Sequence, residues 1–247
     1  MPKKKARKLN ELLEAARQDA TPSVAARRQE AFFMALLDAT VYSHVPREPA
    51  PAGRMRFHQF VRPDNGQTVM PFFTDREQAE FASTGNVGIM AMGARRFFEL
   101  TRGATLMLNP NLDKITLYPP EIKALLNGQP PPFFTREELQ AHEEVGVCLP
   151  TVPTDSMVLG LSGLFAREPS VRAAYLTEIH RGVDDSGVFL LLTLVVTCGN
   201  EERMVQLTTL ELHSISPPLT LPVTMSCQAP DEPLPALCHH GIQFYGT

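Results

Sequence analysis

Three short clusters contain residue types that could carry chemistry, and the first contains residue types that often bind metal ions. Cys238, His239 and His240 place a thiol beside two imidazoles, and both groups bind zinc in proteins. Neighbouring residues seldom reach one ion together, and no further ligands follow at a spacing typical of zinc sites. We therefore expect a buried Cys238 beside two surface imidazoles, and we predict no metal site.

The second cluster resembles the turn that presents a nucleophilic serine in hydrolases. Residues 160–164 are Gly-Leu-Ser-Gly-Leu, whereas that turn needs a glycine two residues after Ser162. Position 164 is leucine, so the motif is broken. We expect a helix over residues 155–165 whose small residues allow close packing against a neighbour.

The third cluster, His142-Glu143-Glu144, lacks the second histidine of a zinc-protease helix. Consecutive helical residues do not face each other, so His142 and Glu143 are poorly placed as a catalytic pair.

Residues 85–88 hold two glycines but neither a phosphate-loop lysine nor the third glycine of a dinucleotide site, which favours a tight turn into a buried strand. The sequence thus predicts no catalytic, cofactor-binding or metal-binding residue, and it predicts that the chain is not an enzyme.

The four cysteines show no spacing typical of a disulfide framework or a metal site. All lie in the second half of the chain, and none forms a Cys-x-x-Cys pair. In a reducing compartment such cysteines are small apolar residues. We expect core positions for Cys148, Cys198, Cys227 and Cys238.

One cluster favours binding instead of catalysis. Arg95 and Arg96 precede Phe97 and Phe98 on a predicted helix. Guanidinium groups and aromatic rings are enriched in protein interfaces, and together they can bind an anion or an acidic peptide. Arginine stems that cover an apolar face would give the same pattern. These four residues form the predicted partner-binding surface, with that alternative left open.

The charge distribution disfavours nucleic-acid binding. Residues 1–28 have a net charge of +5, the rest of the chain has −9, and no lysine or arginine occurs in the last 44 residues. Such a body lacks the basic face that phosphate contacts require. The lysine-rich residues 1–8 are expected to form a disordered, solvated tail.

Hydropathy disfavours a membrane protein. The most apolar run, residues 188–198, is about half the ~20 residues that a spanning helix needs. Residues 9–14, which follow the first lysines, are amphipathic and do not form the apolar core of a signal peptide. We expect a soluble, cytoplasmic protein.

Helices and strands alternate along the first half. Helical periodicity and helix-start signals predict helices at residues 9–18, 22–37 or 22–42, 75–82, 94–100 and 121–126. Apolar runs predict strands at residues 56–62, 67–73, 87–92, 105–108 and 114–118. Thr74 and Glu77 are the expected capping box of the third helix, and Asp64-Asn65-Gly66 is the expected turn of a hairpin. Prolines at 46, 49 and 51 predict an extended connection.

The second half shows the same alternation. Strands are predicted at residues 145–149, 171–180, 188–198, 221–226 and 242–245, and helices at 155–165, 201–213 and 231–238. The apolar residues of 201–213 fit a helical period. Residues 205–207 also alternate between apolar and polar as in a strand, so both structures remain possible there.

The 22 prolines mark element ends and one domain boundary. Residues 128–132 are Gly-Gln-Pro-Pro-Pro, which is typical of an extended, semi-rigid linker. We predict two small α+β or α/β domains with mixed sheets and short helices packed on them. Their expected limits are 9–128 and 135–247, joined by the Pro-rich linker 129–134.

The order of several motifs resembles the SseB (enhanced serine sensitivity) family of bacterial cytoplasmic proteins. The similar segments are residues 9–13 (LNELL), 71–75 (PFFTD), 108–110 (LNP), 120–122 (PEI), 125–128 (LLNG), 171–176 (VRAAYL) and 244–245 (FY). The resemblance implies an SseB N-terminal-like domain at 9–128 and an SseB C-terminal-like domain at 135–247, and it brings no catalytic residues. Residues 1–8 and the proline-rich 46–53 segment depart from the family pattern.

Three functions remain open at this point. The leading hypothesis is a non-catalytic protein that acts through an unidentified protein partner, with the link to amino-acid (serine) metabolism that the family name implies. The second is a sensor that binds an amino acid or another metabolite between the two domains. The third is an enzyme built on Cys238, His239 and His240. The oligomeric state is not predicted.

Overall fold

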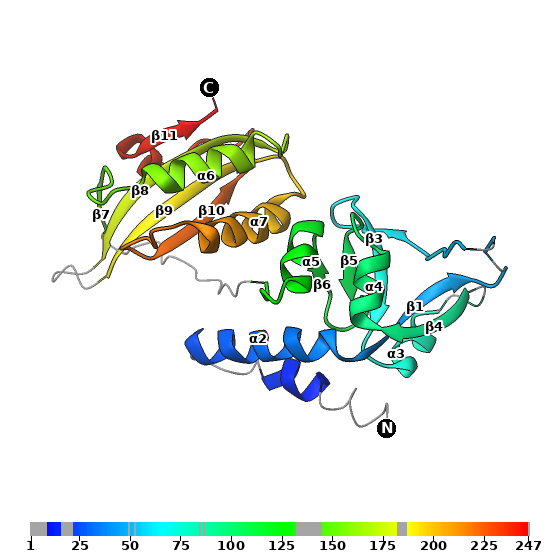
Figure 1. Cartoon of the computed structure of the whole chain (residues 1–247). Coiled ribbons are helices and arrows are strands. Elements are labelled where there is room, and N and C mark those ends of the chain that lie inside the picture. The colour runs from blue at the N-terminus through cyan, green and yellow to red at the C-terminus, as the bar shows by residue number, and fades with distance from the viewer. Residues whose placement is uncertain are drawn as a thin grey trace. The chain divides into compact units, whose positions relative to one another are not determined.

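The structure is a computed structural model, and it describes residues 9–15, 22–48, 50–51, 53–83, 85, 87–131, 145–181 and 187–246. The chain divides into unit 1, Met1–Thr135, and unit 2, Arg136–Thr247, each with its own mixed sheet (Figure 1). The division lies just after the predicted linker 129–134. Two mixed sheets with short helices confirm the predicted fold class. The predicted tail at 1–8 and the His142-Glu143-Glu144 cluster lie outside the described residues.

Unit 1 is built on a six-stranded sheet with the order β4-β1-β3-β5-β6, in which β2 also pairs with β3. Strands β3 and β5 are parallel, and the other pairs are antiparallel. The strands are β1 (Thr40–Pro46), β2 (Phe60–Val61), β3 (Thr68–Phe73), β4 (Val87–Gly93), β5 (Leu106–Leu108) and β6 (Ile115–Leu117). A helix at 9–15 precedes α2 (Pro22–Leu37), α3 (Arg76–Phe81), α4 (Ala94–Leu100) and α5 (Pro119–Leu126).

Side-chain alternation along β3 separates the two faces of this sheet. Phe72 packs against Phe97 and Phe98 of α4 with ring centroids 5.6 Å apart in both pairs, and all three rings are fully buried. They belong to one core with residues of α2 and α5. Because successive strand residues point to opposite faces, Pro71 and Phe73 face away from these helices. There they line the groove described below.

The central strand β1 is the largest error of the sequence-based prediction. A helix to residue 37 or 42 and an extended connection were expected, but residues 40–46 pair with both β3 and β4. The strand contains buried polar residues, Ser43 and His44, so its apolar pattern is interrupted. Both polar groups have partners elsewhere in the chain, since the Ser43 hydroxyl donates to the Pro71 carbonyl at 2.8 Å and His44 Nε2 donates to the Ala79 carbonyl at 2.7 Å.

The start of α3 also differs from the prediction. Asp75, not Thr74, is the N-cap, and its Oδ1 accepts a hydrogen bond from the backbone N of Gln78 at 2.7 Å. Thr74 is used elsewhere, because its Oγ1 accepts from Asn109 Nδ2 at 3.2 Å. The expected hairpin is confirmed, although β2 is only two residues long, and Gly66 in its turn has φ +71. The expected buried strand at 87–92 is instead an edge strand, β4, with partly exposed residues.

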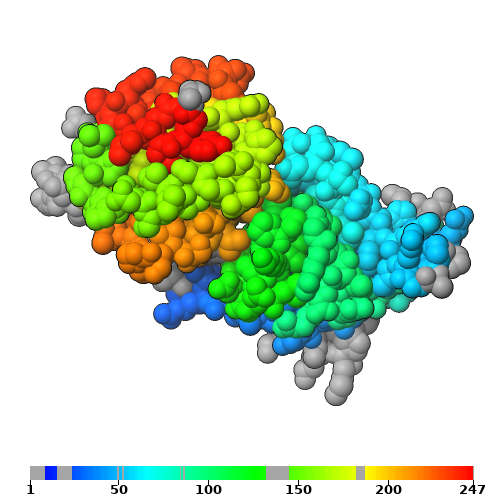
Figure 2. All heavy atoms as spheres, turned by 45° about the horizontal axis from the view of Figure 1, so that its top comes forward, coloured from blue at the N-terminus to red at the C-terminus, as the bar shows by residue number. Residues whose placement is uncertain are grey.

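Unit 2 contains a five-stranded sheet with the order β10-β9-β8-β11, in which β7 also pairs with β8. Its elements are β7 (Val145–Cys148), α6 (Asp155–Phe165), β8 (Val171–Arg181), β9 (Gly187–Val196), α7 (Glu201–Ser214), β10 (Val223–Gln228), the 3₁₀ helix η1 (Ala236–His240) and β11 (Ile242–Tyr245). Residues 201–214 are helical, which settles the alternative left open by the sequence. In the space-filling view β11, in red, lies at the surface of unit 2 (Figure 2).

Helices α6 and α7 lie together on one face of this sheet (Figure 1). A Cβ on Gly160 would lie 3.3 Å from Glu211 Oε1 of α7, so glycine permits the close packing that the sequence predicted. Ser162 lies inside α6 and not on a turn. Within the described residues, no helix has the length and apolar character needed to cross a membrane.

Candidate functional site

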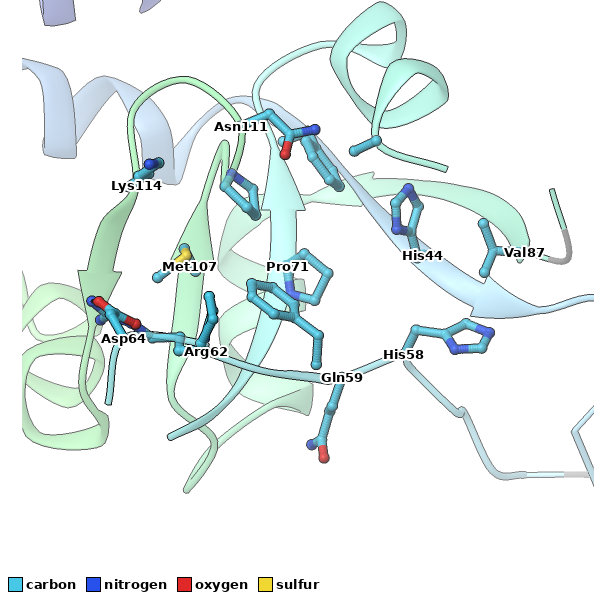
Figure 3. Close-up of a pocket in the computed structure, with 15 residues that line it drawn as sticks. His44, His58, Gln59, Arg62, Asp64, Pro71, Val87, Met107, Asn111 and Lys114 are labelled. Atoms are coloured by element: carbon cyan, nitrogen blue, oxygen red, sulfur yellow. Dashed lines mark hydrogen bonds and ion pairs between the residues drawn. The ribbon is translucent and has the colours of Figure 1, made fainter. Parts of the chain in front are cut away.

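Unit 1 carries a groove of about 690 Å³ on the sheet face that α2, α4 and α5 leave uncovered. Pro71 of β3 and Met107 of β5 are paired neighbours at the base of the groove (Figure 3). Phe73 of β3 also lines this apolar floor. Charged and polar side chains surround this floor, namely His44, His58, Gln59, Arg62, Asp64, Asn111 and Lys114. The groove therefore combines an apolar base with a rim that is mostly cationic or neutral.

Arg62 is held in place across the groove. Its Nε and Nη2 donate to the two carboxylate oxygens of Asp64 at 3.0 and 2.6 Å, and its Nη1 donates to Thr116 Oγ1 at 2.9 Å. The hydrogen bonds from Arg62 are the main reason that the pKa of Asp64 lies below its ordinary value. The guanidinium is thus fixed between β2 and β6, and Asp64 stays ionised beside it.

Two histidines of the groove differ in how they are satisfied. His44 is buried, packs on Phe73 with ring centroids 5.0 Å apart, and donates from Nε2 to the Ala79 carbonyl at 2.7 Å. In contrast, Nε2 of His58 is buried and has no hydrogen-bond partner among the described residues. A buried polar atom without a partner is unfavourable, so a group bound in the groove could supply one.

A second constellation lies in unit 2, where β7 pairs with β8. Glu178 and His180 are two residues apart on β8 and share a face of the sheet. The register places Cys148 opposite Glu178, and Gly146 opposite His180. Cys148 Sγ lies 3.5 Å from His180 Nε2 and 3.9 Å from Glu178 Oε1, while Nε2 and Oε1 are 2.9 Å apart. We call these three residues the Cys-Glu-His cluster.

Glu178 is a buried carboxylate, with 1% of its surface exposed. Burial acts to raise its pKa, but hydrogen bonds from the backbone N and Oγ1 of Thr151, together with His180, outweigh burial and hold the pKa below its ordinary value. Burial and the neighbouring charge of Glu178 raise the pKa of the Cys148 thiol. The carboxylate is therefore ionised at neutral pH, and the thiol keeps its proton.

Comparisons with known proteins agree with the resemblance seen in the sequence. The model of the SseB protein N-terminal domain matches residues 9–124. The chain is 28% identical over 184 residues to Protein SseB of Escherichia coli (strain K12). The aligned region covers 72% of this chain and 70% of that protein. Protein SseB of Shigella flexneri gives the same figures. These matches support the SseB family for this chain.

The relationship to SseB proteins is not confined to unit 1. Because 72% of the 247 residues is more than the 135 residues of unit 1, the aligned region extends into unit 2. No solved structure matches the chain.

The predicted partner-binding surface, Arg95 to Phe98, is divided by the fold. Phe97 and Phe98 are both 0% exposed, because they pack between α4 and the sheet, so their rings are unavailable to a partner in this fold. Arg95 and Arg96 remain at the surface. Arg95 Nη1 donates to the Leu126 carbonyl at the end of α5, and Arg96 pairs with Glu99. Binding of a partner by the two arginines stays a prediction.

The cysteine predictions hold for one residue and fail for another. Cys238 is 4% exposed, while His239 and His240 are exposed, as expected. Cys198 is exposed, so its predicted core position is wrong, because it lies two residues beyond the end of β9 in the turn toward α7. Cys148 and Cys227 are partly buried, and burial raises the pKa of Cys227 to about 11.

The Cys-Glu-His cluster was not found from the sequence. One signal was present, since Glu178 and His180 are two residues apart on a predicted strand and therefore point to the same face. Cys148 is 30 residues away, and its place beside Glu178 depends on strand register that periodicity does not give.

Proposed function

We propose that this SseB-family chain is a non-catalytic bacterial protein that acts by binding another protein through the groove of unit 1. The observation that carries the proposal is the pairing of the groove with strongly exposed apolar side chains. Phe81, which is 84% exposed, precedes the groove residue Ala82 in the chain, and Leu112, which is 66% exposed, follows the groove residue Asn111. Exposed apolar groups beside a concave site are typical of protein contact surfaces.

The charges of the groove indicate the chemistry of the partner. Lys114 and Arg62 are cationic, and Asp64 is the one carboxylate among the lining residues. An apolar segment that carries an acidic side chain would complement both the floor and the rim. The proposed link to serine metabolism rests on the family name and not on a feature of the groove.

Site-specific photo-crosslinking in bacterial cells tests this proposal. A photoreactive aromatic residue at position 81 or 112 should give one discrete adduct with a partner, because each position is exposed and is the chain neighbour of a residue that lines the groove. The matched control is Leu159, which is 77% exposed on α6 of unit 2. Equal adducts from position 159, or none from 81 and 112, would argue against the groove as the contact surface.

A small anionic metabolite is a second candidate for the same groove. The volume of about 690 Å³ lies within the range of small-molecule sites, and the unpartnered Nε2 of His58 could donate to a bound carboxylate. This places the candidate ligand within unit 1, whereas the sequence-based hypothesis placed it between the domains.

A thermal-shift screen of the full chain with amino acids and related acids separates the two functions. A ligand that binds the native state raises the melting temperature, because at 100 times its Kd it adds about 2.7 kcal/mol to the free energy of unfolding. Lys114→Ala should abolish the shift, and Lys123→Ala, which removes an exposed lysine of α5 outside this groove, should not. No shift with any compound at millimolar concentration would leave the protein partner as the occupant.

A further inference from the structure

We propose that Cys148, Glu178 and His180 form a binding site for a divalent metal ion of the zinc class in unit 2. One ligand atom from each of the three residues lies within 4.8 Å of the other two. The three groups come from two adjacent strands, β7 and β8, so the backbone that carries them is held by the sheet.

The distances among the ligand atoms are close to those of a tetrahedral site. Zinc bonds of about 2.0 to 2.3 Å imply separations of about 3.4 to 3.6 Å between ligands in a tetrahedron. The Sγ–Nε2 distance is 3.5 Å, the Sγ–Oε1 distance is 3.9 Å, and the Nε2–Oε1 distance is 2.9 Å. Side-chain movements that shift the ligand atoms by a few tenths of an ångström would bring all three atoms to one ion.

The donor set also favours this class of metal. A thiolate, an imidazole and a carboxylate together suit zinc, whereas magnesium and calcium prefer oxygen ligands. Three protein ligands leave a fourth position for water or another group. Thr151 holds Glu178 through hydrogen bonds to both carboxylate oxygens, which is the role of the outer partners that orient metal ligands.

The same geometry disfavours a nucleophilic cysteine. In a catalytic triad the nucleophile and the acid contact different nitrogens of the histidine. Here Cys148 Sγ and Glu178 Oε1 both approach Nε2 of His180. Glu178 therefore competes with the thiol for this nitrogen, and the three groups point at a common centre instead of forming a relay.

Metal binding has a defined proton balance. The Cys148 thiol loses its proton to solvent. The proton with which His180 Nε2 faces Glu178 in the metal-free state also leaves Nε2, so that the ring binds the ion through the Nε2 lone pair with one proton on Nδ1. Glu178 binds as a carboxylate. Thiolate and carboxylate then carry two negative charges, which match the two positive charges of the ion.

Cobalt titration of the full, untagged chain is the direct test. Co²⁺ replaces Zn²⁺, and it reports a thiolate ligand by a charge-transfer absorption and a tetrahedral site by strong visible bands. We expect one equivalent of Co²⁺ to bind with both signals and Zn²⁺ to displace it. Cys148→Ser should remove the charge-transfer band, and His180→Ala and Glu178→Gln should weaken the visible bands.

Matched variants separate this site from other thiols and imidazoles of unit 2. Cys198→Ser removes an exposed cysteine, and His239→Ala with His240→Ala removes the pair that the sequence singled out; neither change should alter the titration. A band that persists in Cys148→Ser, that disappears in Cys198→Ser, or that never forms in the wild-type protein would overturn the proposal. Circular dichroism without metal identifies any variant that fails to fold.

Alkylation of the wild-type protein gives a test that needs no variant. Zn²⁺ should protect Cys148 from a thiol reagent, as read by mass spectrometry, because a coordinated thiolate is blocked. Cys198 is exposed and should react with or without zinc, and Cys227, with a pKa of about 11, should react slowly in both states. Equal modification of Cys148 with and without zinc would show that the cluster is only a hydrogen-bonded group and does not bind the metal.

Discussion

The two units place polar groups on their sheets in different ways. In unit 1 the side chains of the groove come from strands, a helix end and loops, and they surround a volume of about 690 Å³. In unit 2 three ligand atoms lie within 4.8 Å of one another. Dispersed charges around an apolar floor suit a partner recognised by its shape, whereas convergent lone pairs suit an ion. The spacing of the groups, more than their identity, therefore separates the two kinds of site.

Two buried glutamates show the same contrast. Glu121 in unit 1 is 2% exposed, and its Oε2 accepts a hydrogen bond from the backbone N of Tyr118 at the start of α5, which is a helix-capping role. Glu178 in unit 2 is 1% exposed and lies beside a thiol and an imidazole. A buried carboxylate thus indicates a functional site only when its neighbours include other metal-binding or reactive groups.

Zinc should produce the largest difference between the units. At a concentration 1,000 times its Kd, an ion bound only by the native state adds about 4.1 kcal/mol to the free energy of opening. Hydrogen exchange should show this protection for amides of β7 and β8, and no change for β2 and β3 at the groove. Equal protection in both units would mean that zinc binds nonspecifically.

Gly146→Val should damage the cluster through its backbone. A Cβ at position 146 would lie 3.3 Å from the Cβ of His180, which belongs to the paired strand and cannot move without it. We expect a loss of about 1 to 3 kcal/mol in the free energy of unfolding and weaker metal binding. Urea unfolding measures the first effect. Gly163→Ala is the control, since nothing lies within 4 Å of its added Cβ, and it should stabilise α6 by up to about 1 kcal/mol.

Thr151→Val should weaken metal binding while leaving the three ligands in place. The change removes the hydroxyl that bonds Glu178 and keeps the backbone N–H. Loss of such an outer partner lowers metal affinity about 10- to 100-fold. Thr116→Val is the counterpart in unit 1, because it removes a partner of Arg62. A cobalt titration should detect only the first change, and a similar loss in both would contradict separate sites.

Lys114→Gly should have the smallest effect on stability and a clear effect on the groove. Lys114 has φ +53, a left-handed conformation that glycine adopts without steric cost. The variant should be as stable as the wild type or more stable by up to about 1 kcal/mol, as measured by thermal unfolding. Lys114→Ala removes the same charge but keeps the strain. Both variants should reduce crosslinking at position 81, and a reduction in neither would exclude Lys114 from the contact.

Much of the fold was predictable because local signals agreed with the tertiary structure. The hairpin turn at Asp64-Asn65-Gly66, the helix at 119–126 with its prolines at the start, and the strands β8 and β9 all follow from turn chemistry and apolar runs. The strand β1 was missed because Ser43 and His44 are buried polar residues. Their burial is stabilised by hydrogen bonds to the Pro71 and Ala79 carbonyls, which are distant in the sequence.

The candidate sites were less predictable than the fold. Phe97 and Phe98 are consecutive on a helix, and the sequence alone does not show that both are covered. Their burial follows from the position of α4 among the sheet, α2 and α5. The groove residues likewise lie on segments that are far apart in the sequence, and the sheet order β4-β1-β3-β5-β6 brings these segments together.

The amino-acid sequence by itself determined the α+β class, most element positions and the resemblance of this protein to the SseB family, because these depend on short-range patterns and the order of motifs. Only the tertiary structure decided which polar groups meet. Strand register brings Cys148 to Glu178 and His180, and sheet order brings Arg62 to Thr116 and Met107 to Pro71. Register and sheet order are set by the packing of whole faces, so no local segment of the chain contains them.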